Sequence, residues 1–217
     1  MTGTRRRAIE AFGALCGILA PILSFGGFML IGSAGFAVQP GATVDEVAGV
    51  VRQSAPPLAF AGLFLDIFGS LAFVVFAGRL WGTLRQAEGT PAWLSTSAFG
   101  AALLAVAGSF VDKTIFAAIF TLAGGGLEPG VAAALYAAAS ASFGLFSAFA
   151  GLFIGLATVV ILQTGVLPRW LGWLGVAVFL LSVAGVAVAE VGFLAFPVVL
   201  VWMIATSILL LRRPLTA

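Results

Sequence analysis

The chain of 217 residues contains no histidine, one cysteine (Cys16) and few charged residues, with Lys and Arg numbering ten and Asp and Glu eight. These absences exclude disulfides within the chain, zinc sites built on several cysteines, imidazole acid–base chemistry and the Ser-His-Asp triad. The net charge of +2 is too small and too scattered for a nucleic-acid partner. We therefore predict a protein that is not an enzyme, with no catalytic, cofactor-binding or metal-binding residues.

Apolar residues make up 62% of the sequence and charged residues only 8%, whereas soluble domains carry about 25% charged residues. The chain is therefore expected in a membrane, where each helical crossing needs about 20 apolar residues. We predict a single transmembrane domain over residues 1–217, an all-α polytopic bundle of six transmembrane helices arranged as three hairpins. The six stretches run approximately from Ala11 to Ser33, Pro57 to Ala77, Leu94 to Lys113 (extending to Ala123), Val131 or Phe143 to Leu162, Trp170 to Ala189 and Val191 to Leu211.

Arginine placement predicts the orientation, because short cytoplasmic loops retain positive charge. With six spans, eight arginines fall on one side and only Arg52 falls in a loop on the other; the eight are Arg5, Arg6, Arg7, Arg79, Arg85, Arg169, Arg212 and Arg213. We therefore expect a multi-pass protein of the plasma membrane with both termini in the cytoplasm. A cleavable signal peptide is the alternative for the first span, but its apolar run exceeds the usual length of about 7 to 15 residues.

The loop after the first span is the longest polar connection. Its Thr43-Val44-Asp45-Glu46 sequence is typical of a capping box, in which the threonine hydroxyl and the glutamate carboxylate satisfy free helix amides. Val44, Val47 and Val51 recur on one helical face. We predict a short helix near residues 44–53, lying against the outer surface of the bundle and binding no ligand.

An internal repeat appears at an offset of 77 residues, where Pro91-Ala92-Trp93-Leu94 matches Pro168-Arg169-Trp170-Leu171. At the same offset, Lys113 corresponds to Glu190. The third and fifth spans are therefore expected to have equivalent places in a bundle whose three hairpins share one orientation.

Small residues four positions apart mark helix contacts in lipid, because they let two backbones approach closely. The candidate packing positions are Gly13 and Gly17 in the first span and Gly144, Gly151 and Gly155 in the fourth. We assign these glycines to packing within the bundle in preference to self-association.

Asp66 is the charge placed deepest in a predicted span, roughly 10 Å below the outer surface. Such a group usually faces protein or water and has a partner. Lys113 can direct its long stem outward or toward Asp66, and Asp112 is its neighbour. We predict an outer polar cluster of Asp66, Asp112 and Lys113 with Glu190 above it. It is either a structural ion pair or a proton or cation site.

The third and fourth apolar stretches are longer than a perpendicular crossing requires, reaching about 30 residues each. Either the two helices tilt strongly, or an apolar hairpin projects beyond the membrane. A projecting apolar segment, Thr114–Ser142, would be a contact for another membrane protein or for lipid.

The segment Gly165-Val166-Leu167-Pro168-Arg169-Trp170-Leu171-Gly172, the arginine-rich start and the Leu-Asp-Ile-Phe-Gly stretch around Asp66 resemble an uncharacterised, actinobacterial-type membrane family of the domain-of-unknown-function class. That resemblance implies a six-span bacterial plasma-membrane protein and supplies no catalytic residues. Two function classes follow: a non-enzymatic bundle with a structural, partner-binding or lipid-binding role, or a small proton- or ion-coupled transporter or channel using Asp66, Asp112 and Lys113. The lipid bilayer is the one partner common to both.

Overall fold

The computed structural model describes residues 3–36, 38, 42–52, 57–187 and 189–213. Within this part of the chain there are six helices long and apolar enough to cross a membrane and no strand. The long helices are α1 (Gly3–Ile31), α3 (Pro57–Glu88), α4 (Trp93–Leu122), α5 (Pro129–Thr164), α6 (Arg169–Ala187) and α7 (Ala189–Arg212). The predicted all-α membrane bundle is therefore confirmed.

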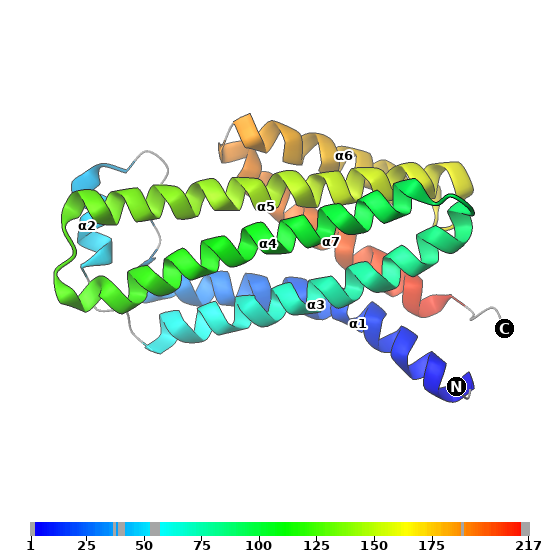
Figure 1. Cartoon of the computed structure of the whole chain (residues 1–217), viewed down its shortest axis with the longest axis horizontal. Coiled ribbons are helices and arrows are strands. Elements are labelled where there is room, and N and C mark those ends of the chain that lie inside the picture. Colours follow the sequence, from blue (N-terminus) through cyan, green and yellow to red (C-terminus); the bar gives the residue numbers. More distant parts are fainter. Residues whose placement is uncertain (1–2, 37, 39–41, 53–56, 188, 214–217) are drawn as a thin grey trace.

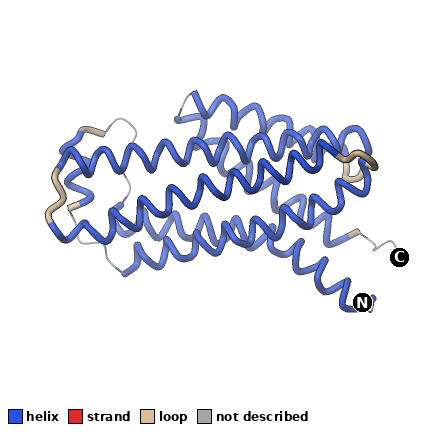
Figure 2. Tube along the Cα trace, viewed as in Figure 1, coloured by secondary structure: helices blue, strands red, loops and turns tan. Residues whose placement is uncertain are grey.

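The six long helices form a closed ring in chain order, with α7 packed back against α1. The hairpins α1–α3, α4–α5 and α6–α7 run side by side, connected by short loops, and both described ends of the chain lie at the same end of the bundle (Figures 1 and 2). We call this the proximal end. The arrangement agrees with three hairpins of one orientation.

The main core lies inside the ring and depends on aromatic contacts between helices. Trp202 of α7 is completely buried, and its ring lies edge-on to Phe153 of α5 with centroids 6.1 Å apart. Its indole Nε1 donates a hydrogen bond to the Leu171 carbonyl oxygen of α6 at 3.2 Å. The Trp202 side chain thus joins three helices. Large apolar side chains such as Trp173 and Phe64 instead face outward and are 65% and 61% exposed.

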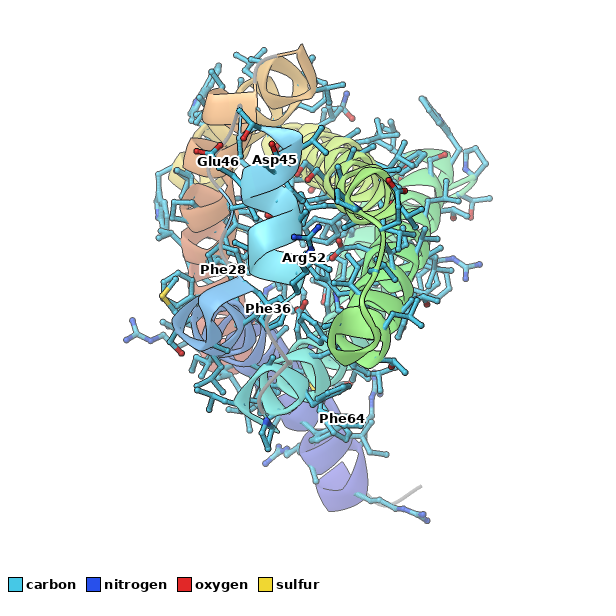
Figure 3. The ribbon with its side chains drawn as sticks, turned by 90° about the vertical axis from the view of Figure 1, so that its left-hand side faces the viewer. Phe28, Phe36, Asp45, Glu46, Arg52 and Phe64 are labelled. Atoms are coloured by element: carbon cyan, nitrogen blue, oxygen red, sulfur yellow. The ribbon has the colours of Figure 1, made fainter. Side chains whose placement is uncertain are left out.

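The far end of the bundle carries a second core, which α2 (Val44–Val51) covers (Figure 3). The predicted capping box is confirmed: the Thr43 backbone N–H donates to Glu46 Oε2 at 2.7 Å, and the Glu46 N–H donates to Thr43 Oγ1 at 3.3 Å. The predicted apolar face is partly wrong, because Val44 is 52% exposed and Ala48 is buried beside Val47 and Val51.

The α4–α5 hairpin is longer than its neighbours, since the 36 residues of α5 span about 54 Å and the 19 residues of α6 only about 28 Å. The α6–α7 turn consequently stops short of the end where α2 lies (Figure 1). Beyond that turn the hairpin is packed against other elements and does not stand alone. We call this packed end the distal cap; it consists of η1 (Gly32–Phe36), α2, residues 57–63 and residues 114–142.

The final turn differs from its prediction. The predicted spans end at Ala189 and begin again at Val191, which puts Glu190 in the turn between them, but α7 already begins at Ala189. Glu190 therefore lies in the first helical turn of α7, and its side chain is outside the described part of the structure.

Candidate functional site

The deepest charge of the bundle is paired across two neighbouring helices. Asp66 on α3 and Lys113 on α4 approach with Lys113 Nζ 2.9 Å from Asp66 Oδ2. The Lys113 side chain is only 6% exposed and that of Asp66 23%. Of the two directions open to the lysine stem in the sequence, the structure shows the one toward Asp66.

Two serines complete this contact. The Lys113 ammonium also donates to Ser109 Oγ at 2.5 Å and to the Ser109 carbonyl oxygen at 3.4 Å. Ser109 Oγ lies 3.0 Å from Ser70 Oγ, which donates to the Asp66 carbonyl oxygen at 3.1 Å. Because the Ser70 proton goes to Asp66, Ser109 must donate to Ser70. We call these four residues the α3–α4 polar cluster; its hydrogen bonds all run in one consistent direction.

Helix α1 fixes the backbone that carries Asp66. A Cβ added to Gly27 would meet the Gly62 carbonyl oxygen and lie 2.9 Å from the Asp66 backbone nitrogen. One helical turn further, Gly69 lies against Ser24. This close crossing leaves no room for larger side chains, so α1 holds α3 in the position that presents Asp66 to α4.

Asp112 does not join the polar cluster, although the sequence prediction placed it there. Among the described residues it forms no hydrogen bond and no ion pair, although the charges of Lys113 and Asp66 act on it at longer range. The side chain of Glu190, the fourth predicted member, lies outside the described residues. The structure thus brings together Asp66 and Lys113 and leaves Asp112 beside them.

Tyr136 on α5 is a polar residue near this site that the sequence prediction did not include. The Val38 backbone and the Asp112 carboxylate both act on its hydroxyl electrostatically. Its ring packs edge-on to Phe116 of α4, with centroids 6.1 Å apart. In the sequence, Tyr136 could have been noticed because it is the single tyrosine of the chain and lies within an alanine-rich run.

Four of the five predicted packing glycines lie at close contacts. Gly13 lies against Arg79, Gly17 against Phe76 and Ser207, Gly151 against Ser182, and Gly155 against Phe179. No described atom lies within 4 Å of a Cβ built on Gly144, so its place at a helix contact stays a prediction. The α6 helix that covers Gly151 and Gly155 ends at Ala187, so the same face of α5 continues past its neighbour.

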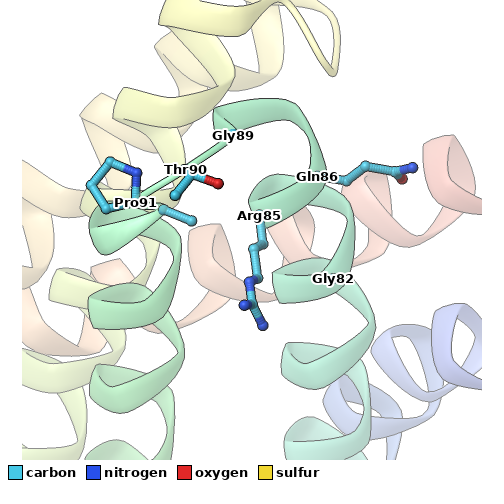
Figure 4. Close-up of a pocket in the computed structure, with 7 residues that line it drawn as sticks. Gly82, Arg85, Gln86, Gly89, Thr90 and Pro91 are labelled. Atoms are coloured by element: carbon cyan, nitrogen blue, oxygen red, sulfur yellow. The ribbon is translucent and has the colours of Figure 1, made fainter.

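A pocket of about 330 Å³ lies at the proximal end, between the end of α3 and the start of α4 (Figure 4). Its charged side chain is Arg85, whose guanidinium carbon lies 5.2 Å from the centroid of the Trp81 ring. Nearby, the Glu88 carboxylate accepts hydrogen bonds from the backbone N–H groups of Leu94 and Ser95 at 3.0 and 2.8 Å. That carboxylate caps α4, so the local charges already have structural partners.

The described residues contain no group of three or more His, Cys, Asp or Glu side chains that could hold a metal ion. Comparison with models of known protein families, with curated proteins and with solved structures finds no match to this chain. What this membrane bundle does has to be argued from the polar cluster and from the surfaces around it.

Proposed function

We propose that this chain is a non-enzymatic protein of the bacterial plasma membrane, with both termini in the cytoplasm, whose bundle has a structural role and binds another membrane protein or lipid. The observation that carries the proposal is the closed hydrogen bonding of Lys113. An ammonium group has three donors, and three acceptor atoms surround this one: Asp66 Oδ2, Ser109 Oγ and the Ser109 carbonyl oxygen. No donor is left for a transported anion or a substrate.

A transport site needs charged groups that exchange their partners during the cycle. The α3–α4 polar cluster instead resembles a structural ion pair, because the lysine is almost fully buried and both serines are already hydrogen-bonded. Buried polar contacts of this kind can fix the register between two helices. If Asp66 and Lys113 fix the register between α3 and α4, the bundle keeps one defined shape. A fixed shape supports the proposal that the bundle binds a partner.

The distribution of arginine supports the proposed orientation. Arg5, Arg6 and Arg7 begin α1, Arg169 begins α6, and Arg212 ends α7, so all five belong to the proximal end, where both termini lie (Figure 1). Loops rich in arginine are retained on the cytoplasmic side. The distal cap would then face away from the cytoplasm.

The proposed partner contact is the exposed part of residues 114–142 in the distal cap. Ile119, Phe120 and Ala132 are buried there under α2 and α3, but Leu122 and Val131 remain 46% and 48% exposed. These two side chains flank the α4–α5 turn. Exposed apolar side chains at the end of this long hairpin favour a contact with protein or lipid.

The test is co-purification after mild solubilisation, with bound proteins and lipids identified by mass spectrometry. We expect a bound protein that is lost from the Leu122→Glu and Val131→Glu variants. Val44→Glu is the matched control, because Val44 is equally exposed, at 52%, in the same cap but outside the segment. A homogeneous species with no bound protein, or equal loss from all three variants, would contradict the partner contact.

A second candidate function, proton- or ion-coupled transport, is favoured by one observation: Asp112 has no hydrogen bond among the described residues and lies next to the Asp66–Lys113 pair. Its test is flux across proteoliposomes that contain a trapped ion-sensitive dye. Transport predicts a flux that disappears in Asp112→Asn protein of unchanged thermal stability, whereas Asp45→Asn, on the exposed face of α2, leaves it intact. Equal signals with wild-type protein and with empty vesicles would eliminate this candidate.

A further inference from the structure

The proximal end contains a second set of charges, where α1, α3 and the end of α7 meet. Arg79 of α3 lies with its Nη2 atom 3.5 Å from Glu10 Oε2 of α1, and Arg6 Nε lies 3.0 Å from Glu10 Oε1. The charge of Arg213, which follows α7, also acts on Arg79. We call these four residues the arginine cluster; the sequence prediction treated its arginines only as markers of orientation.

The arginine cluster is not balanced internally. Arg6 and Arg79 share the carboxylate of Glu10, which forms its shorter contact with Arg6, and Arg213 adds a third positive charge that acts on Arg79. Its contact with Arg79 is long at 3.5 Å. The positive charge of Arg79 is therefore only partly compensated by the described residues around it.

Arg79 also has hydrogen-bond donors to spare. A guanidinium has five N–H donors in a fixed planar arrangement, and two of its nitrogens have partners: Nη1 donates to Thr83 Oγ1 at 2.6 Å and Nη2 contacts Glu10. Its Nε atom is buried without a hydrogen-bond partner among the described residues. The side chain remains 18% exposed, and each of the two Nη atoms carries a second N–H donor that no described hydrogen bond uses.

Exposed apolar side chains also lie on the first turns of α1. Ile9 and Phe12, one and two positions from Glu10 in the sequence, are 55% and 57% exposed. Figure 1 shows the first turns of α1 diverging from the other helices at the end where α7 also finishes. A ligand that combines an anionic group with an apolar chain would match both parts of this region.

We propose that Arg6, Arg79 and Arg213 bind the phosphate group of an anionic phospholipid from the surrounding leaflet. Arginine forms short paired hydrogen bonds with phosphate oxygens, and basic sites between transmembrane helices are suited to anionic headgroups. A phosphate would supply the missing negative charge and accept hydrogen bonds from the free guanidinium N–H groups. The acyl chains would lie along Ile9 and Phe12. This inference rests on the membrane location and not on the proposed protein partner.

The experiment measures lipid binding to the intact purified chain by native mass spectrometry from detergent. Phosphatidylglycerol is the anionic probe, phosphatidylcholine is the zwitterionic control, and inorganic phosphate is added as a competitor. We expect phosphatidylglycerol to bind more tightly than phosphatidylcholine, with little competition from millimolar phosphate. Equal binding of the two lipids would overturn the proposal, and complete competition by free phosphate would overturn the assignment to lipid.

The variants Arg6→Gln and Arg213→Gln test the residues without disturbing the core, because both arginines are exposed. Each is expected to weaken phosphatidylglycerol binding about fivefold. Arg169→Gln is the matched control, an exposed arginine at the same end of the bundle. An equal loss in Arg169→Gln would show general charge attraction and overturn a defined site.

Arg79→Lys separates headgroup geometry from charge. Lysine retains the positive charge but lacks the planar fork of donors. We expect weaker phosphatidylglycerol binding at unchanged phosphatidylcholine binding, with folding checked by the thermal midpoint. Wild-type affinity in a folded Arg79→Lys protein would remove Arg79 from the site. Wild-type protein that co-purifies with a protein partner but binds the two lipids equally would contradict this inference alone and leave the proposed function standing.

Discussion

Replacing Asp66 with asparagine should cost more stability than any other single change to a charged residue in the spans. The substitution removes the negative charge that lies 2.9 Å from Lys113 Nζ and leaves the ammonium group with neutral acceptors alone, the two Ser109 oxygens and the amide oxygen of the new side chain. Removing one partner of a buried ion pair costs about 3–5 kcal/mol. Since the Asp66 side chain retains 23% exposure, we expect a loss near the lower end, about 3 kcal/mol.

The assay is reversible unfolding in mixed detergent micelles, followed by tryptophan fluorescence. The double variant Asp66→Asn/Lys113→Met is the decisive comparison, because it removes the stranded charge and fills a similar volume. It should recover most of the loss, since replacing both members of a buried pair by neutral groups is often neutral or stabilising. If the double variant is no more stable than Asp66→Asn alone, or if Asp66→Asn changes stability by less than about 1 kcal/mol, the structural role of the pair is refuted.

Three further results are expected. Gly151→Leu should lower the thermal midpoint because its side chain would collide with α6, whereas Gly144→Leu should change it little; equal effects in differential scanning fluorimetry would contradict the assigned contacts. The Thr43 backbone N–H and hydroxyl lower the pKa of Glu46 from its ordinary value of 4.5, so the capping box stabilises α2 fully above pH 4.5 and is lost as the pH falls through the lower pKa of the folded state. Hydrogen exchange in α2, corrected for intrinsic rates, should therefore rise between pH 4.5 and that lower pKa in wild type and not in Glu46→Gln. In a background lacking the native cysteine, a membrane-impermeant maleimide applied to intact cells should label Gly49→Cys and leave Gln163→Cys unlabelled; the reverse pattern would invert the proposed topology.

The features predicted correctly from the sequence are those decided within one segment. The capping box joins Thr43 and Glu46, which are three residues apart, so the geometry of one helical turn suffices. The six crossings follow from the lengths of the apolar runs. Neither prediction requires knowledge of how any two segments pack.

The features that the sequence left open or predicted wrongly depend on where a neighbouring element lies. Val44 shares the spacing of Val47 and Val51, but α2 meets η1 and α5 with a face centred on Ala48. Gly144 belongs to a row of small residues, yet no described atom lies within 4 Å of a Cβ built on it. The position of a neighbouring element thus decides which face of a helix is buried, and the spacing of residues within one segment does not reveal that position.

The polar cluster shows the same limit for side-chain direction. The depth of Asp66 could be estimated by counting residues, and its need for a partner followed from the cost of burying a charge. The connection through Ser70 and Ser109 could not be predicted, because it requires the register between α3 and α4. That register places the two hydroxyl groups 3.0 Å apart although their residues are 39 positions apart in the chain.

Helix α3 carries both ion pairs that join two helices in the described part of the chain, and its geometry keeps them independent. Asp66 and Arg79 are 13 residues apart, which separates them by about 20 Å and turns them toward nearly opposite sides of the helix. Asp66 accordingly meets Lys113 of α4, whereas Arg79 meets Glu10 of α1. Substitutions more than about 10 Å apart with no shared partner add in their effects on stability. An anion bound at the arginine cluster would therefore stabilise the contact between α1 and α3 without altering the α3–α4 polar cluster, so the lipid site and the structural pair contribute separately to the same bundle.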